Sequence, residues 1–514
     1  MLRVLILGNL LSLFLSTLTA CAPVQPRPEL PFETAVQPAA GGPLDNVIER
    51  AEASHPGVSA FRLVVDGPEA FMLRVRSAVL AARSIDVQTY LWHEDDTGIY
   101  LANTLLEAAD RGVKVRLLLD DMDGRALNEG LAALAAHPNI HVRTFNPFRS
   151  RSGMLGLVGE SMANFKRVNR RMHNKSWIVD NRIAVTGGRN IGDEYFGASD
   201  EMNFFDLDFA MIGPVVREAS DVFDRYWNSP YAYPMEVLDP ASVSREALKR
   251  LRTEYTERSK AVAQSRYAAA LRMDDVIKLL IEGHWPMEWA SRYLFVADDP
   301  SKVVMDRKDA QRTQVGAALR TVMNELKNEL TIVSPYFIPG KRLTEQLVAS
   351  VREGKRVSVL TNSLAANDVA AVHGGYSRYR KPLLAGGVEL WELKPQADGQ
   401  VRSSLFGSSG ASLHTKALLM DGNIAFVGSY NLDPRSTWLN CEQGVMVENP
   451  KLAAQLESIF ADYSAGDHAW KLSLNKHGLN WDDGNKRFDS DPQASLGRRF
   501  KAWMARVFHL EAQL

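Results

Sequence analysis

The sequence predicts an α/β protein built from two homologous domains that pack with pseudo-twofold symmetry around one shared site. Three observations lead to this fold class. A length of 514 residues exceeds what one hydrophobic core usually organises. A segment around position 173 recurs around position 414. In both halves, a β-rich run, a helical pattern and a second apolar run precede that segment, and this order is typical of parallel sheets.

The composition is that of a globular protein without a preference for polyanions. Hydrophobic residues make up 46% of the chain and charged residues 24%, which excludes a disordered or collagen-like chain. Lysine and arginine total 60 against 61 aspartate and glutamate residues, so no basic excess is available to neutralise a nucleic-acid backbone. We therefore expect no nucleic-acid partner. With only two cysteines, the chain has no disulfide framework and no thiolate zinc site.

Residues 1–21 are predicted to be a targeting segment rather than part of the fold. Arg3 supplies a positive start, residues 4–15 form an apolar run, and Leu-Thr-Ala leads into Cys21. This arrangement resembles a bacterial lipoprotein signal, which implies that Cys21 is lipidated and becomes the first residue of the mature chain. The alternative is an uncleaved N-terminal membrane helix, although the run is short and Asn9 interrupts it.

Residues 22–58 are predicted to be a tether. Six prolines between positions 23 and 43 favour an extended chain that holds the following body off the bilayer. The expected location is a membrane-anchored lipoprotein that faces the periplasm, and Ala22 after the cysteine favours the outer membrane. With Cys21 lipidated, Cys441 has no disulfide partner and is expected to fill a small space in the core.

The two α/β domains are expected at 59–235 and 311–470. In the first, β-rich residues 84–92 and 111–121 flank a helical pattern whose apolar positions recur at the helical period. The second domain repeats the pattern with β-rich runs at 330–338 and 353–363. Residues 236–310 are predicted to be a helical, charged connector, and residues 471–514 a C-terminal tail with an amphipathic helix.

The strongest internal repeat centres on two histidines. MHNKSWIVDNRIAVTGGRN surrounds His173 and LHTKALLMDGNIAFVGSYN surrounds His414, with matched positions at a constant offset of 241 residues. The repeated residues are His173, Lys175, Asp180, Gly187 and Asn190 in the first copy, and His414, Lys416, Asp421, Gly428 and Asn431 in the second. Each copy reads His-x-Lys-x4-Asp, and we predict that these six His, Lys and Asp residues are catalytic.

The spacing of the motif predicts its local geometry. Residues i and i+2 of a strand project from the same face, so the histidine and lysine of each copy point together. Asp-Asn at 180–181 and Asp-Gly at 421–422 then indicate hairpin turns. A single histidine on an apolar strand is more often a packed core residue. Two copies at a fixed offset favour one composite site, where two histidines and two lysines converge.

Such a site suits a phosphodiester. Two lysines and the amides of Asn190 and Asn431 can bind the nonbridging oxygens and the charge that develops during phosphoryl transfer. One neutral imidazole can attack phosphorus while the other protonates the leaving oxygen and then deprotonates the acceptor, so no metal or cofactor is required. Carboxylates must orient the imidazoles, and the candidates are Asp206 or Asp208 after the first motif and Glu442 after the second.

The duplicated motif resembles that of the phospholipase D superfamily. Four further segments, NRRMHNK, GGRNIGDEYF, GSYNLDPRS and HGGYSRYRKPLL, resemble the bacterial cardiolipin synthase branch, and its third class most closely. The resemblance extends over nearly the whole chain beyond Cys21. It implies two phospholipase D-like domains and a phosphohistidine intermediate, with His173 as the nucleophile and His414 as the acid and base. The copies diverge after the asparagine, where IGDEYF replaces LDPRST, so a symmetric role for Ser436 is in doubt.

The resemblance also implies phospholipid substrates. Phosphatidylglycerol is the expected acceptor, and the phosphatidyl donor is either a second phosphatidylglycerol or phosphatidylethanolamine. Three alternatives stay open: a phospholipase D hydrolase that releases phosphatidic acid, a metal-independent nuclease, and a lipoprotein scaffold that has lost activity. The intact motifs disfavour the scaffold, and the charge balance and the lipoprotein signal disfavour the nuclease.

Two weaker features are basic or aromatic segments near the motifs. The cluster before His173 is either a contact for an anionic headgroup or a solvated loop, and comprises Lys166, Arg167, Arg170 and Arg171. A second, polar and aromatic segment is a candidate loop on the acceptor side, and includes His373, Tyr376, Tyr379 and Arg380.

Two more features lie further from the motifs. The acidic run of Asp120, Asp121 and Asp123 suggests a magnesium site, but a solvated loop is expected because the chemistry needs no metal. Near the C-terminus, SLGRRFKAWMARVF (495–508) is either an interfacial amphipathic helix or a helix docked on the core.

Overall fold

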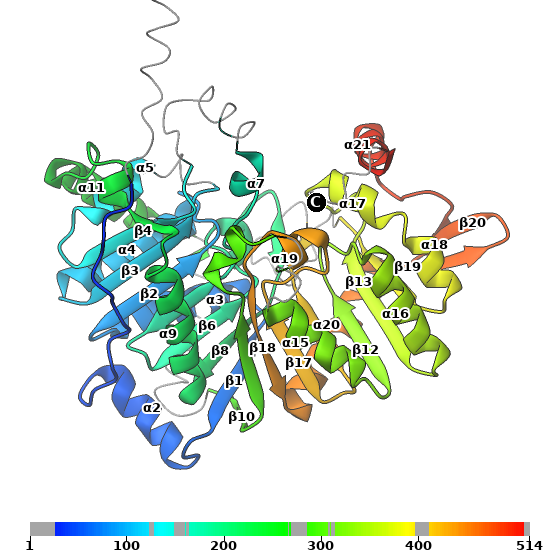
Figure 1. Ribbon diagram of the computed structural model, residues 1–514, viewed down its shortest axis with the longest axis horizontal. Coiled ribbons are helices and arrows are strands. Elements are labelled where there is room, and N and C mark those ends of the chain that lie inside the picture. The colour runs from blue at the N-terminus through cyan, green and yellow to red at the C-terminus, as the bar shows by residue number, and fades with distance from the viewer. Residues whose placement is uncertain are drawn as a thin grey trace, which may run out of the picture.

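The computed structural model describes residues 26–122, 128–148, 160, 164–265, 267–268, 285–306, 309, 314–395 and 411–507. Cys21 and the predicted signal lie outside these residues. The described chain forms two α/β halves side by side, one in blue to green and the other in green to red in Figure 1. Within the described residues, no helix is both long enough and apolar enough to cross a membrane.

The first half is built on a nine-stranded sheet in the order β10-β1-β8-β6-β5-β2-β3-β4-β9. Only the β2–β3–β4 pairs are parallel, and the other neighbours are antiparallel. The strands are β1 (Ser59–Val64), β2 (Ser84–Thr89), β3 (Lys114–Asp120), β4 (Ile140–Phe145), β5 (Ser176–Val179), β6 (Ile183–Gly187), β8 (Asp208–Ile212), β9 (Ala232–Pro234) and β10 (Glu288–Ala290).

The second half repeats this order in a ten-stranded sheet, β11-β18-β17-β16-β12-β13-β14-β19-β20-β21. Its β12–β13–β14 pairs are again the parallel ones. The strands are β11 (Tyr293–Ala297), β12 (Glu329–Val333), β13 (Arg356–Asn362), β14 (Glu389–Leu393), β16 (Ala417–Met420), β17 (Ile424–Gly428), β18 (Gln443–Glu448), β19 (Ala469–Asn475), β20 (Gly478–Asp482) and β21 (Arg487–Phe488). The seven strands from β1 to β4 thus match the seven from β11 to β14 in order, which confirms the predicted pair of homologous domains.

Helices cover both sheets on two faces. The first half carries α2 (Pro43–Ala53), α3 (Gly67–Leu80), α4 (Asp96–Asp110), α5 (Asn128–Ala135), α7 (Phe165–Val168), α8 (Asp193–Phe196), α9 (Pro214–Trp227), α10 (Met235–Leu238) and α11 (Arg245–Gln264). The second carries η1 (Pro300–Val303), α15 (Gln314–Asn324), α16 (Gly340–Arg352), α17 (Ala370–Tyr376), α18 (Arg380–Ala385), α19 (Pro434–Trp438), α20 (Pro450–Tyr463) and α21 (Leu496–Val507). Polar caps begin several of them: Asp95 accepts from Gly98 N (3.0 Å) at the start of α4.

A single central core joins the two halves. α9 and α20 lie between the sheets, and each contacts strands of both halves. Their apolar residues belong to one buried cluster with residues of both sheets, such as Phe209 of β8 and Val445 of β18. Two separate cores lie on the outer faces of the sheets. The halves therefore share a central core and pack directly against each other.

The predicted connector and tail both contribute strands to the sheets. α11 supplies the helix expected in 236–310 and packs on α4 with Leu248, Leu251 and Tyr255 buried. The end of the same segment forms β10 and β11, which extend one sheet each. In the tail, β20 and β21 extend the second sheet before α21 begins. β10 and β11 pair with β1 and β18, which are distant in sequence and which local patterns do not reveal. β20 and β21 instead follow β19 as consecutive antiparallel strands.

Candidate active site

The two histidine motifs occupy matching places in the two halves. Each ends in a hairpin, β5–β6 and β16–β17, as predicted. Asp180, Asn181, Asp421 and Gly422 all have positive φ angles of 52° to 62°, as a two-residue turn with left-handed central residues requires. The histidines precede β5 and β16 and so lie at the carboxyl end of the antiparallel neighbours β2 and β12. Sites in α/β proteins commonly form at this edge of the sheet.

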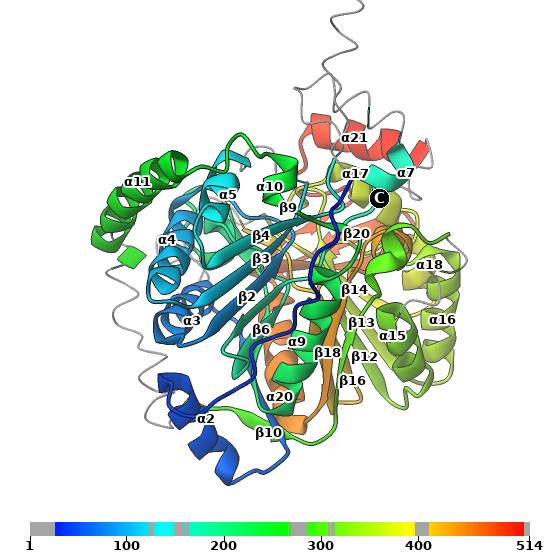
Figure 2. The ribbon, with the colours of Figure 1, turned by 60° about the vertical axis from the view of Figure 1, so that its left-hand side comes forward.

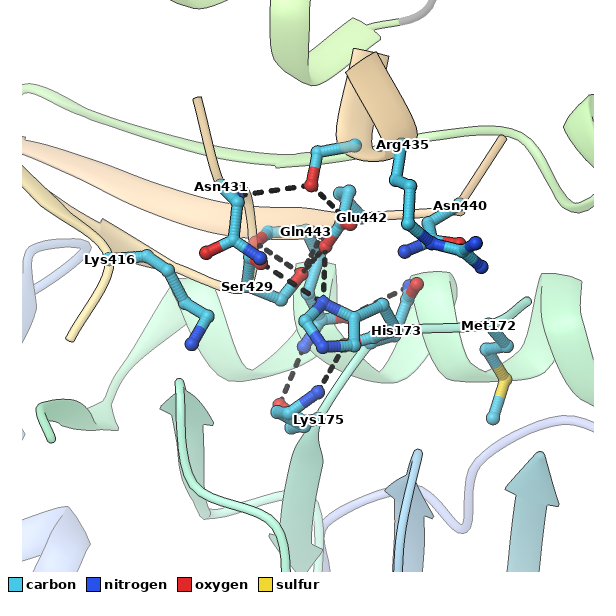
Figure 3. A network of polar contacts seen from close by, with 12 residues as sticks. Met172, His173, Lys175, Lys416, Ser429, Asn431, Arg435, Asn440, Glu442 and Gln443 are labelled. Carbon is cyan, nitrogen blue, oxygen red and sulfur yellow. Dashed lines mark hydrogen bonds and ion pairs between the residues drawn. The ribbon is translucent and has the colours of Figure 1, made fainter. Parts of the chain in front are cut away.

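Each histidine is held by a carboxylate of the opposite half. His173 Nδ1 lies 2.9 Å from Glu442 Oε2, and His414 Nδ1 lies 2.6 Å from Asp206 Oδ2. Figure 3 shows Glu442 and Ser429 converging on the His173 ring. Of the two first-half candidates, Asp206 contacts a histidine and Asp208 does not. Asp208 is buried instead against Arg74 (3.0 Å) and Arg189 (3.3 Å), so its predicted supporting role was wrong.

Main-chain hydrogen bonds also join the two halves beside each histidine. His173 N donates to Cys441 O (2.8 Å), and Cys441 N donates to Arg171 O (2.8 Å). In the matching place, β15 (Ala411–Leu413) pairs in parallel with β7 (Asn203–Phe205), and His414 N donates to Phe205 O (2.8 Å). Each histidine thus takes both its backbone and its side-chain support from the other half. Cys441 is fully buried in the central core.

The two carboxylates have different surroundings. Ser429 donates to Glu442 Oε2, and Ser436 of α19 donates to Glu442 Oε1 (2.9 Å), so two hydroxyls fix this carboxylate. The position that matches Ser429 is Gly188, where an added Cβ would lie 2.0 Å from Asp206 Oδ1. The two halves therefore differ here, as the sequence indicated for Ser436. Ser429 and Ser436 both bond to Glu442, whereas Gly188, at the position of Ser429, leaves room for Asp206.

Burial controls the charge of the histidines. Burial lowers the pKa of His173 to about 4, although the Glu442 carboxylate opposes this shift. Burial also lowers the pKa of His414, and the nearby Lys416 ammonium adds to this effect. Both imidazoles are therefore neutral near pH 7. With Nδ1 directed at a carboxylate, Nε2 of each ring is left for chemistry.

The carboxylates stay ionised despite their burial. Burial alone would raise the pKa of Asp206, but His414 and Lys416 hold it at about 2. Burial likewise opposes ionisation of Glu442, and contacts with His173 and Ser429 bring its pKa below the ordinary value. Each imidazole therefore faces a full negative charge, which stabilises the imidazolium that forms when the ring accepts a proton.

The two lysines are poised to bind an anion. Lys175 Nζ donates to His173 O (2.7 Å), and Lys416 Nζ donates to His414 O. The ammonium ends of both point toward the space beside the His173 ring (Figure 3). Burial and the charge of Lys416 lower the pKa of Lys175 to about 7, and burial lowers that of Lys416 to about 8. A phosphodiester between the two ammonium groups would offset the repulsion between them, so the unliganded site favours the binding of an anion.

The predicted asparagines lie in the site, whereas the aspartates of the two motifs lie away from it at the hairpin turns. Asn190 lies in the site, but its amide donates to Tyr195 Oη (2.8 Å). Asn431 Oδ1 is buried and has no hydrogen-bond partner among the described residues, so that oxygen is available to a substrate. Asp180 and Asp421 lie at the far ends of their strands, where they accept hydrogen bonds from the backbone at 82–84 and 327–329. These contacts assign the aspartates to the scaffold, not to the reacting groups for which they were predicted.

The basic and acidic segments near the first motif pair with each other. Arg171 is buried and forms an ion pair with Asp120 (3.3 Å), and Arg170 donates to backbone carbonyls of the second half. Asp121 accepts from Phe148 N (2.6 Å). The expected solvated acidic loop was therefore wrong for Asp120 and Asp121, while Asp123 lies outside the described residues. Lys166 is exposed on α7, and Arg167 forms an ion pair with Glu160.

The segment from His373 to Arg380 is not a loop. It forms α17 and the start of α18, and His373, Tyr376 and Arg380 are buried. Arg380 joins Glu392 (2.7 Å) and Asp491 (2.7 Å) in a cluster that fastens the C-terminal segment to the second sheet. The prediction of an acceptor-side loop was wrong, because its polar residues find partners more than ten positions away.

Sequence reasoning missed the aromatic residues that border the histidines, among them Tyr90 and Tyr195. The Tyr90 ring lies 5.1 Å from the His173 ring, edge to face, and Lys175 Nζ lies 5.4 Å from the Tyr90 ring. The Tyr195 ring lies 5.3 Å from the His414 ring. A signal for Tyr90 was present, because Tyr336 occupies the same place in the second β-rich run. Aromatic walls keep water away and strengthen the electrostatic interactions inside the site.

Comparisons with known proteins agree with this geometry. A family model described as "Cardiolipin synthase, PLD-like domain" matches residues 77–227 and 319–463. Cardiolipin synthase C of Escherichia coli is 40% identical over 468 residues, which cover 89% of this chain and 97% of that protein. Cardiolipin synthase of Oceanobacillus iheyensis is 24% identical over 462 residues, covering 90% of this chain and 77% of that protein.

A solved structure shares the fold. The crystal structure of phosphatidylserine synthase from Haemophilus influenzae covers 91% of this chain and all of its own chain, with a TM-score of 0.57 and 14% sequence identity. At this identity the likeness concerns the fold alone. The two copies of the family domain, and the 40% identity that spans nearly a whole relative, show that this chain belongs to the phospholipase D superfamily and to its cardiolipin synthase family.

Proposed function

We propose that the protein is a cardiolipin synthase that transfers a phosphatidyl group to a hydroxyl of phosphatidylglycerol through a phosphohistidine. One observation carries the proposal: two largely buried imidazoles, each backed by a carboxylate of the other half, stand with two lysines (Figure 3) in one site. Membership of the cardiolipin synthase family supports the choice of a phospholipid as substrate. The proposed acceptor is phosphatidylglycerol, and the donor is a second phosphatidylglycerol or phosphatidylethanolamine.

In the first step, Nε2 of His173 attacks the phosphorus of the donor. The bond between phosphorus and the headgroup oxygen breaks, and the leaving oxygen takes a proton from His414, which must enter this step as the imidazolium. Asp206 stabilises that charge, and Glu442 holds the His173 ring with Nε2 unprotonated. Lys175 and Lys416 bind the nonbridging oxygens as charge grows on them.

In the second step, His414 is neutral and accepts the proton of the acceptor hydroxyl. The acceptor oxygen attacks phosphorus, the bond to His173 breaks, and both imidazoles return to their starting states. Water in place of the acceptor would give phosphatidic acid by the same route. The exclusion of water thus decides between transfer and hydrolysis.

Product analysis tests the proposed activity. Purified protein in mixed micelles with acyl-labelled phosphatidylglycerol should form cardiolipin, and the His173→Ala variant should form none. Phosphatidic acid without cardiolipin would assign a hydrolase instead. Cleavage of an oligonucleotide in the presence of a chelator would favour a nuclease. Expression in a bacterial strain that lacks cardiolipin should restore it in lipid extracts.

A trapped intermediate tests the roles of the two histidines. The His414→Ala protein should accumulate a phosphatidyl adduct on His173, because the breakdown of the intermediate needs a base. Mass spectrometry of the quenched protein detects this adduct. An adduct on His414 of the wild type, with none on His173, would reverse the two roles and leave the two-histidine mechanism in place.

We further propose that the protein is a lipoprotein anchored through Cys21 and facing the periplasm, with the outer membrane favoured. The lipoprotein-like signal supports this location. The predicted extended tether does not, because Arg27 and Ala35 bond to the first half and α2 buries Leu44 and Ile48 in its core. The wild type should carry the mass of a lipidated chain, and the Cys21→Ser protein should lack it and leave carbonate-washed membranes. A Cys21→Ser protein that keeps the wild-type mass would contradict the anchor.

A further inference from the structure

α21 exposes a stripe of large apolar side chains. Leu496, Phe500 and Trp503, which we call the α21 stripe, are 86%, 61% and 49% exposed. Positions i, i+4 and i+7 lie along one face of a helix, so the three side chains form one continuous surface. The Phe500 and Trp503 rings stack at 6.0 Å. An exposed apolar stripe of this kind is costly in water, and it indicates a surface that another apolar phase covers.

The opposite face of α21 is firmly docked. Ala502 and Ala505 are buried against α17, and an added Cβ on Gly374 would lie 2.3 Å from Ala502 O. Arg498 donates to Leu364 O (3.4 Å) and to Asn367 O. Both alternatives that the sequence left open for this segment therefore hold at once, because the helix is packed on the core and still presents an apolar stripe. The stripe is thus fixed in place before anything binds it.

α21 borders the active site. Asn367, which accepts from Arg498, is followed by Asp368, whose carboxylate accepts from Tyr336 Oη (2.6 Å). Asp368 is also among the charges that influence Lys416 of the site. The C-terminal helix therefore contacts the segment next to Asp368, which bonds to Tyr336, the counterpart of Tyr90 in the second half. In Figure 1 and Figure 2 α21 lies beside α17, at the end of the molecule opposite α2.

Further exposed apolar side chains lie at the same edge of the molecule. Met122 follows the carboxyl end of β3, Phe165 begins α7, and Val369 precedes α17, and all three are exposed. α7 and α17 share the upper end of the molecule with α21 in both views (Figure 1, Figure 2). These exposed apolar residues thus belong to elements at the end of the molecule that carries α21 and the carboxyl end of β3 (Figure 1, Figure 2).

The charge of α21 matches an anionic surface. Residues 496–507 contain four basic residues and no acidic one, namely Arg498, Arg499, Lys501 and Arg506. Lys501 and Arg506 are exposed, and at about 3.6 residues per turn Arg506 lies beside the α21 stripe. Aromatic and aliphatic side chains on one face, flanked by cations, are the features of a helix that lies in the headgroup region of an anionic bilayer.

We propose that α21 is the membrane-docking element: it seats the enzyme on an anionic phospholipid surface, with Leu496, Phe500 and Trp503 in the boundary between headgroups and acyl chains. The active-site edge then faces the bilayer, so a phospholipid reaches the histidines without leaving the membrane completely. This inference rests on the proposed function only for the identity of the substrate, and vesicle binding tests it separately from activity.

Fluorescence quenching tests the insertion of the stripe directly. The full-length protein is mixed with vesicles of phosphatidylglycerol and phosphatidylcholine, with and without bromine on the acyl chains. Wild type should lose more tryptophan fluorescence to the brominated vesicles than the Trp503→Phe variant does, since the indole is the group in contact with the chains. Equal quenching of the two proteins overturns the proposal, even if a lipid anchor holds both on the vesicle.

Activity on two forms of substrate gives the second test. Phe500→Ser/Trp503→Ser should lower the rate on vesicles about tenfold, while the rate on dispersed short-chain phosphatidylglycerol stays within about twofold of wild type. Val79→Ser/Leu294→Ser is the matched control, since both residues are exposed and apolar but lie on α3 and β11. Equal losses on both substrates, or losses that match the control, contradict the proposal.

Two further experiments test whether docking needs anionic lipid and whether a second copy of the chain covers the α21 stripe instead. Lys501→Glu/Arg506→Glu should weaken binding to anionic vesicles and leave binding to pure phosphatidylcholine unchanged, whereas Lys341→Glu on α16 should change neither. If sedimentation shows a dimer that Phe500→Ser/Trp503→Ser dissolves, a second copy covers the stripe and the proposal fails. If no variant forms cardiolipin or phosphatidic acid but the Trp503 quenching persists, the proposed function fails and the docking element stands.

Discussion

Glu442 and Asp206 each serve a histidine that belongs to the other half of the molecule. The contacts are short, 2.9 Å for His173 and 2.6 Å for His414, and both carboxylates are fully buried. Such a pair decides which ring nitrogen carries the proton. An uncharged amide in its place keeps the shape of the site but removes the charge that stabilises an imidazolium.

We therefore expect the two carboxylates to give different defects when they are altered. Glu442→Gln should impair formation of the His173 adduct by about 10²-fold or more, whatever the leaving group. Asp206→Asn should slow ordinary phospholipids to a similar degree, but should slow a p-nitrophenyl phosphodiester much less, because nitrophenolate leaves without a proton. Single-turnover kinetics with both substrates measure the difference. Glu448→Gln, at the far end of the strand β18 that follows Glu442, is the control, and identical profiles for Glu442→Gln and Asp206→Asn would contradict the crossed assignment.

The two lysines predict how anion binding depends on pH. Their pKa values lie at about 7 for Lys175 and about 8 for Lys416, so Lys175 loses its charge as the pH rises through 7 and Lys416 as it rises through 8. Sulfate, whose own charge is constant here, should bind with proton uptake, and its affinity should fall between pH 6 and pH 9. The fall should approach about a hundredfold per pH unit at the upper end, because each of the two lysines must then take up a proton. Calorimetry in buffers of different ionisation enthalpy measures the proton uptake. Lys175→Met should flatten the profile, Lys341→Met should not, and an affinity independent of pH would refute the charge states.

The residues also show what a sequence can predict about a site. The constant offset identified His173, Lys175, His414 and Lys416, which the structure brings together, because the motif is local and repeated. The choice between Asp206 and Asp208 was not predictable from the position of Glu442. The chain between Asn190 and β8 differs in length from the chain between Asn431 and β18, so the two carboxylates do not align in the repeat. The same pattern includes Asp180 and Asp421, whose backbone contacts at the hairpin turns depend on neighbouring strands.

Among the elements, α21 depends on one glycine. Gly374 of α17 is the point where the two helices touch, and a side chain there has no room beside Ala502 O (2.3 Å) and Ala505 Cβ (3.0 Å). The sequence suggested a loop in this place because the segment is polar and aromatic. The partner that makes it a helix is more than 120 residues away, so no local signal was present.

Gly374→Val should therefore detach α21 and leave the sheets intact. The expected results are faster hydrogen exchange across 496–507, a small loss of overall stability, and a loss of rate on vesicles but not on dispersed substrate. Gly497→Ala is the matched control, since its Cβ would meet no neighbour within 4 Å and alanine favours a helix. Unchanged exchange in Gly374→Val would show that the close packing does not hold α21 in place.

At the scale of the whole molecule, the two halves form one cooperative unit. The central core takes residues from both sheets, and Cys441 lies in it with its thiol fully buried. The backbone of the same residue bonds to Arg171 and His173 of the first half. The repeated domains indicated two similar units, but only the arrangement of α9 and α20 shows that neither unit completes its core or its site alone.

Thiol labelling of Cys441 measures this cooperativity. In a Cys21→Ser background Cys441 is the single thiol, and a thiol reagent reaches it only when the halves separate. Labelling should therefore follow the same urea dependence as circular dichroism, since separating the halves exposes the core that both need. Val304→Cys in the same background supplies an exposed thiol near this interface, which should label at once at any urea concentration. Labelling of Cys441 well below the unfolding transition would mean that the halves part while each stays folded. The active site would then be lost while each half stays folded, because His173 and His414 would each lose the carboxylate and the backbone partner that the other half provides.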